Sequence, residues 1–235
     1  MRLLLAVCSI VVGFRTAEAQ HRGGRFDAEM QVGSGHRRTL LELDNSTASS
    51  AGEGAYLRIQ SRLQVTDRLG LRLDFNGAGN TGGESAGTLF GGESLNQIGS
   101  DVALSAFHFT GTAGVGYRWA NTVDDSTAQW VFPRFGITIE EIPFGDTGLL
   151  GDLAYRGTPF GKEIDNEEIE VLGYEVILRM RYQPQILGSW YASLGYRHEY
   201  FTVWAEPTDY TERVSLLLLG IGYSPRPSRQ AHSEK

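Results

Sequence analysis

Cysteine is almost absent from this chain: Cys8 is the one cysteine, and it lies in an apolar run over residues 3–12. Met1 and Arg2 precede the run, and the small-x-small sequence Ala17-Glu18-Ala19 follows it. This is the pattern of a cleaved secretory signal peptide, which we expect over residues 1–19. The remaining chain then has no thiol, so disulfides and thiolate zinc sites are excluded and the fold depends on packing and backbone pairing.

Long hydrophobic runs and basic stripes are also missing. No second stretch reaches the ~18–20 apolar residues of a membrane-spanning helix. The 28 acidic residues outnumber the 21 basic ones, and the formal charge of −7 excludes a surface that neutralises nucleic-acid phosphates. Apolar residues do not recur at helical spacing, so helices are not expected to form the core.

Alternation of period two is the pattern that is present. In residues 174–182 the even positions are Tyr, Val, Leu, Met and Tyr, while the odd positions include Glu175, Arg179 and Arg181. A strand turns alternate side chains to opposite faces. In a soluble barrel the apolar face would point inward, whereas in a membrane barrel it faces lipid between two aromatic belts.

The chain contains enough such segments for about eight antiparallel strands. We expect one bulged strand over 25–43, with the bulge at Gly33-Ser34-Gly35, because its alternation changes phase there. The other predicted strands are 55–65, 69–77, 102–119, 128–140, 167–182, 189–203 and a last strand that ends at Tyr223.

The connections between these segments alternate in length. Long stretches at 44–54, 78–101 and 141–166 alternate with short ones at 66–68, 120–127 and 183–188. Outer-membrane barrels have this asymmetry, with short periplasmic turns and long external loops. The predicted belts contain Tyr117, Trp119, Tyr182, Trp190 and Tyr223 on the periplasmic side, and Phe75, Phe107, Tyr174 and Tyr200 on the external side.

Two stretches near the C-terminus resemble those of small bacterial outer-membrane barrels of the OmpA/OmpX-like type. They are Ser193-Leu194-Gly195-Tyr196-Arg197 and Leu218-Leu219-Gly220-Ile221-Gly222-Tyr223. The resemblance is one of architecture over roughly residues 25–224. It implies an outer-membrane location and contact with lipid, lipopolysaccharide and the barrel assembly machinery. Members of that group usually end the barrel on an aromatic residue, whereas here Tyr223 precedes a polar tail that reaches Lys235.

The polar faces of the predicted strands carry charges that would point into the barrel. An eight-stranded barrel has room for side chains and little else, so we expect a paired charge network rather than a charged pore or a ligand site. Its predicted members are Arg58, Arg62, Arg72, Asp74, Arg134, Glu175, Arg179, Arg197 and Glu199.

Catalysis is the sharper alternative. His108 lies on a polar face that we expect near the outer rim, and Asp74 on a neighbouring strand could orient it as a base. The stretch 141–168 also carries seven carboxylates, which favour either a solvated acidic loop or divalent cations bridging to lipopolysaccharide phosphates. These are Glu141, Asp146, Asp152, Glu163, Asp165, Glu167 and Glu168.

The sequence therefore predicts an all-β, single-domain, up-and-down transmembrane barrel over 20–224, followed by a polar tail over 225–235. We expect a monomer without metal or cofactor, whose role is structural, surface-binding through external loops, or a narrow pore. The alternatives are a lipid-modifying barrel enzyme of the acyltransferase or deacylase type and a secreted soluble barrel with an apolar ligand.

Overall fold

The computed structural model describes residues 25–43, 46–80, 94–121, 127–144, 148–164, 170–205 and 208–225. The predicted signal peptide and most of the C-terminal tail lie outside these ranges. The described chain consists of strands and one short 3-10 helix, η1 (Gln185–Leu187). The strands are β1 (Arg25–Leu43), β2 (Ser46–Gln64), β3 (Leu69–Asn80), β4 (Ser94–Ala106), β5 (Phe109–Asn121), β6 (Thr127–Pro143), β7 (Leu149–Thr158), β8 (Lys162–Glu163), β9 (Glu170–Tyr182), β10 (Trp190–Ala205) and β11 (Thr208–Tyr223).

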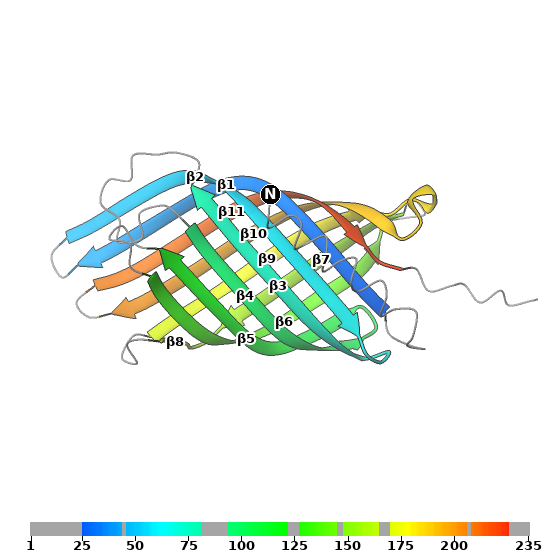
Figure 1. Ribbon diagram of the computed structural model, residues 1–235, viewed down its shortest axis with the longest axis horizontal. Coiled ribbons are helices and arrows are strands. Elements are labelled where there is room, and N and C mark those ends of the chain that lie inside the picture. The colour runs from blue at the N-terminus through cyan, green and yellow to red at the C-terminus, as the bar shows by residue number, and fades with distance from the viewer. Residues whose placement is uncertain are drawn as a thin grey trace, which may run out of the picture.

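The strands form one closed antiparallel barrel (Figure 1). Each strand pairs with its sequence neighbour, and β11 pairs with β1 to complete the ring. The two-residue strand β8 is the exception, since it fills a gap between β6 and β9 beyond the end of β7. Ten strands therefore make the wall, all joined by up-and-down connections.

The barrel is apolar outside and charged inside. On β11, Leu217, Leu219 and Ile221 point outward, and Leu219 is 62% exposed. Buried residues of the inward faces include many arginines and carboxylates, such as Arg134, Asp74 and Glu175. An apolar outer wall is stable against lipid and not against water, so the soluble-barrel alternative is wrong. Among the described residues, no helix is long and apolar enough to span a membrane.

The strands extend well beyond the apolar band at one end of the barrel. On β11, the outward side chains from Tyr223 to Arg213 span about ten residues, or ~33 Å of strand. With a tilt of ~45° this length matches the ~25 Å apolar band of outer-membrane barrels. Beyond Arg213, the strands β1, β2, β10 and β11 continue toward the left of Figure 1. Both ends of the barrel domain lie at the other, periplasmic end, as the even strand number requires.

The predicted number of about eight strands differs from the observed ten at two places. Residues 102–119 were expected to be one strand, but they form β4 and β5 around a tight turn at Phe107 and His108. The expected long loop at 141–166 contains β7, whose inward residues Asp152 and Arg156 are charged. Each difference adds one strand, so the parity is kept.

Two expectations about β1 and β2 were also wrong. The bulge at Gly33–Gly35 is absent, because β1 keeps an unbroken register with both β2 and β11. The expected loop at 44–54 is mostly strand, since β2 pairs with β1 from Ser46 onward.

Candidate functional site: the barrel lumen

The centre of the lumen is filled by ion pairs that join distant strands. Arg134 on β6 donates to Asp74 on β3 at 2.7 Å and to Asp101 on β4 at 3.2 Å. Glu175 on β9 accepts hydrogen bonds from Arg156 at 2.7 Å and from Arg197 at 2.8 Å. We call these six residues the central layer. Every one is buried, so the pairing compensates the cost of removing the charges from water.

A glycine makes room for this layer. A Cβ atom on Gly99 of β4 would lie 1.2 Å from Nη1 of Arg134. The guanidinium therefore lies directly against the β4 backbone, where any other residue would displace it.

A second set of ion pairs lies toward the external end, and we call it the external layer. Arg118 on β5 donates to Glu199 on β10 and, at 2.6 Å, to Glu212 on β11. The strands β5 and β11 lie on opposite sides of the ten-stranded ring, and β10 is next to β11. Glu212 also pairs with Arg37 on β1 at 2.6 Å, and Glu199 with Arg197 of the central layer at 2.6 Å. The external layer therefore crosses the full width of the lumen.

Aromatic and aliphatic side chains pack next to the external layer. Phe201 lies under the Arg118 guanidinium, 4.1 Å from ring centroid to Cζ, and its ring contacts those of Trp130 and Phe132. Val171 and Val203 are buried inward-facing neighbours. Beside them, Tyr56, Val214, Leu216 and Leu218 form a buried hydrophobic cluster. The external half of the lumen is thus closed by apolar packing as well as by charge.

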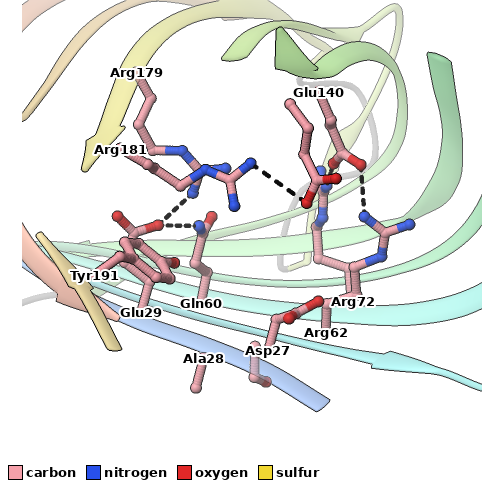
Figure 2. A pocket seen from close by; sticks show the side chains of 12 residues that line it. Asp27, Ala28, Glu29, Gln60, Arg62, Arg72, Glu140, Arg179, Arg181 and Tyr191 are labelled. Atoms are coloured by element: carbon pink, nitrogen blue, oxygen red, sulfur yellow. Dashed lines mark hydrogen bonds and ion pairs between the residues drawn. The ribbon is translucent and has the colours of Figure 1, made fainter. Parts of the chain in front are cut away.

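The periplasmic end holds a pocket of about 460 Å³ including its open mouth (Figure 2). Glu140 accepts hydrogen bonds from Arg62 at 2.6 Å and from Arg72 at 2.9 Å. On the other side of the pocket, Arg179 pairs with Glu29. Asp152 accepts from Arg179 at 2.9 Å and from Arg181 at 2.7 Å. We call these seven residues the periplasmic layer.

The nine charged residues predicted to face the interior all lie there. Eight of them make ion pairs: Arg62, Arg72, Asp74, Arg134, Glu175, Arg179, Arg197 and Glu199. Arg58 is buried and donates to Gln31 at 3.5 Å. The prediction omitted Glu29, Asp101, Arg118, Glu140, Asp152, Arg156, Arg181 and Glu212, which share the same layers.

Strand parity was the signal that could have found most of these omitted residues. Glu29 alternates with outward Ala28 and Met30, and Glu212 continues the inward series of Val214 and Leu216. Asp152 was assigned to the acidic loop of 141–168, but its partners are two arginines inside the barrel. Asp152 is therefore not one of the carboxylates that could bind divalent cations at the cell surface.

The proposed catalytic pair of His108 and Asp74 is not formed. His108 lies in the β4–β5 turn at the periplasmic end, not at the outer rim, and its Nδ1 is 3.1 Å from the Glu140 carbonyl oxygen. Asp74 is buried in the central layer with Arg134. The β4–β5 turn, which the sequence did not predict, explains the error, because the chain reverses its direction at Phe107 and His108.

The predicted aromatic residues lie on the outer wall at both ends of the band. Tyr182, Trp190 and Tyr223 mark the periplasmic end, where the Trp190 and Tyr223 rings contact at 5.5 Å. Tyr174 stacks on Tyr200 at 5.4 Å at the external end. Three end assignments were wrong because of the same β4–β5 turn: Tyr117 and Trp119 lie at the external end of β5, and Phe107 is in the periplasmic turn.

Comparison with known proteins supports the same architecture. No protein-family model matches the chain, and no curated protein matches its sequence. The outer membrane protease OmpT from Escherichia coli has a similar structure, with a TM-score of 0.56 at 8% identity, over 87% of this chain and 99% of that one. Neisserial surface protein A follows with a TM-score of 0.40 at 12% identity, over 86% and 99% of the two chains.

The chain has the fold of a bacterial outer-membrane β-barrel. The apolar outer wall and the two aromatic ends fit the bacterial outer membrane, which is where this barrel resides. At 8% identity the likeness to OmpT extends to the fold alone.

Chemically, the lumen of this outer-membrane barrel is filled by ion-paired side chains. Its arginines and carboxylates are occupied with one another at three levels, and apolar side chains close the external half. Such an arrangement fills the lumen with side chains from both walls of the barrel.

Proposed function

We propose that the protein works without catalysis, as a closed outer-membrane barrel that holds a β-sheet above the membrane to bind a partner at the cell surface. One observation carries the proposal. Ion pairs span the lumen from β5 to β10 and β11, while strands from the same wall continue past the apolar band.

The projecting sheet is regular. From Thr39 to Leu43, β1 pairs on one side with β2 and on the other with β11. β11 in turn pairs with β10 as far as the Ala205–Thr208 register. These continuations add about five residues, or ~17 Å of strand, beyond the row of Arg38 and Arg213. A paired sheet presents a regular binding surface where the sequence predicted an external loop over 44–54.

One edge of this sheet can accept another strand. Among the described residues, pairing between β2 and β3 stops at the Gly54–Asn80 register, although β2 begins at Ser46. Over residues 46–52 its outer edge has no strand partner within the described ranges. Such an edge presents backbone donors and acceptors, which extended peptides use for β-augmentation.

Neither enzymatic alternative has comparable support. The E. coli relative is a protease, but a shared barrel fold does not transfer an activity. The lipid-modifying hypothesis depended on His108 and Asp74, which lie at the periplasmic turn and in the central layer. A pore would require the ion-paired layers to open.

The proposal is tested by shortening the projecting hairpin. Leu40 to Ser49 are deleted, because these two residues are register partners, and Thr39 is joined to Ser50 by an Asn-Gly turn. Cells that produce either protein are applied to arrays of glycans and extracellular-matrix proteins. We expect wild-type cells to bind a ligand on the array and the shortened variant to lose that binding while it still shows the gel mobility of a folded barrel.

Activity assays test the enzymatic alternatives. Wild-type protein and the His108→Ala variant are assayed for peptide hydrolysis and for lipid A mass changes. A wild-type activity that the His108→Ala variant lacks contradicts the proposal, and so does ligand binding that is unaffected by the deletion.

A further inference from the structure

A row of outward side chains crosses four strands at the external limit of the apolar band. Tyr174, Tyr200, Arg213 and Arg38 are successive register partners on β9, β10, β11 and β1. Toward the periplasm, the outward residues of β11 are Ser215 and then Leu217, Leu219 and Ile221. The row therefore lies where headgroups meet acyl chains.

Two arginines face each other in this row. Arg38 and Arg213 are direct cross-strand partners, and both are exposed on the outer wall. Directly opposite side chains start about 4.5–5.5 Å apart at Cβ, and like charges in such a pair are destabilising. Arg213 lies over the Tyr200 ring, 5.7 Å from its centroid. Among the described residues, no ion pair joins either arginine to a carboxylate, in contrast to the arginines of the lumen layers.

Among the described residues, the nearest carboxylates do not pair with these two arginines. Glu212 points inward to Arg118 and Arg37. Glu53 on β2 is in register with His36, two residues nearer the periplasm than Arg38. His198 contributes its Nδ1 to a hydrogen bond with Ser215 at 3.0 Å. The outer wall therefore presents a guanidinium pair above an apolar surface.

We propose that Arg38 and Arg213 bind a phosphate of lipid A in the outer leaflet, with its acyl chains against Leu217, Leu219 and Tyr196. Guanidinium groups bind phosphate by paired, charge-assisted hydrogen bonds, and one phosphate between them turns the repulsion into attraction. Charge complementarity selects a phosphorylated lipid, and the apolar residues beneath select one that is anchored by its chains. The proposal depends on the membrane orientation of the barrel and not on what the projecting sheet binds.

The test uses full-length protein refolded in a neutral detergent, with thermal unfolding followed by tryptophan fluorescence. Three probes are titrated: lipid A, dephosphorylated lipid A and inorganic phosphate. A ligand that binds only the folded state raises the unfolding temperature. We expect lipid A to stabilise the wild type, and the double variant R38Q/R213Q to bind lipid A at least about tenfold more weakly.

Matched variants separate binding from folding. Arg68→Gln removes an exposed arginine in the periplasmic turn and should keep the wild-type response. The charge-conserving R38K/R213K should bind lipid A more weakly than the wild type and more tightly than R38Q/R213Q, because lysine keeps the charge but not the paired hydrogen bonds. Without lipid A, R38Q/R213Q should unfold at the wild-type temperature or above, because a repulsive pair is gone.

The proposal is overturned if R38Q/R213Q binds lipid A as tightly as the wild type. It is equally overturned if dephosphorylated lipid A or inorganic phosphate stabilises the wild type as much as lipid A does. This last comparison needs no variant, so it decides the question even where a substitution prevents refolding.

Discussion

Arg118 and Glu212 meet at 2.6 Å across the barrel, one from β5 and the other from β11, and each side chain is only 1% exposed. Glu212 also forms an ion pair with Arg37, so its carboxylate connects β11 with β1 and β5. In this relationship a charge from one wall of the barrel is neutralised by the opposite wall.

Removing that carboxylate should destabilise the barrel. The Glu212→Gln variant leaves Arg118 and Arg37 with less compensation in a buried site, and breaking a buried pair costs about 3–5 kcal/mol. Unfolding in urea, followed by the loss of the fast-migrating gel band, should therefore occur at lower denaturant. Asp67→Asn, in the exposed turn before β3, is the matched control and should leave the midpoint unchanged.

The closed lumen predicts the absence of single-channel current. In planar bilayers the wild type should stay at baseline. The double variant R118A/F201A, which removes the crossing guanidinium and the ring beneath it, should also stay at baseline, because the central and periplasmic layers remain in place. Wild-type channels of defined size would contradict the assignment of a closed barrel.

Close packing of β5 against β4 predicts a difference between two of its glycines. A Cβ atom on Gly114 would lie 2.0 Å from the Ser100 carbonyl oxygen, whereas one on Gly111 has its nearest contact at 4.0 Å. Gly114→Ala should lower the free energy of unfolding by about 1–3 kcal/mol, as overpacking does. Gly111→Ala should have little effect, and equal urea midpoints for the two variants would show that β4 and β5 are not paired in this register.

The outward, lipid-facing wall predicts a cost for an introduced charge. Leu219 is 62% exposed to lipid, so Leu219→Arg near the midplane should cost about 2–4 kcal/mol and reduce the amount of assembled barrel. Leu178→Arg on β9 should act in the same way, because Leu178 is also on the outer wall. Quantitative blotting of outer-membrane fractions measures the effect, and unreduced levels for both variants would contradict a lipid-facing wall.

Strand phase was predictable from the sequence wherever one face is apolar and the other charged. The alternation of Leu178 with Arg179, or of Leu73 with Asp74, assigned the correct side chains to the interior because the membrane reverses the usual pattern. The alternation could not predict where the chain turns when the turn contains no residues typical of turns. Phe107 has a φ of 57° in the β4–β5 turn, where glycine or asparagine is usual.

Two further strand segments were not predicted, because their composition is typical of loops. The stretch Asp152-Leu153-Ala154-Tyr155-Arg156 alternates correctly, but its charges and its acidic flanks suggested a loop. The first residues of β2, Ser46 to Ser50, are small and polar, and they form strand because β1 supplies backbone partners. The ion-paired layers were only partly predictable, because pairs such as Arg134 with Asp74 depend on strand register around the ring.

The most direct test of the account is fractionation of producing cells, followed by gel electrophoresis of the outer-membrane fraction with and without boiling. The account predicts a protein in that fraction whose unboiled form migrates faster than the boiled form, as a folded, detergent-resistant barrel does. A soluble protein in the periplasm or medium, without a mobility shift, would contradict the assignment of the charged face to the interior.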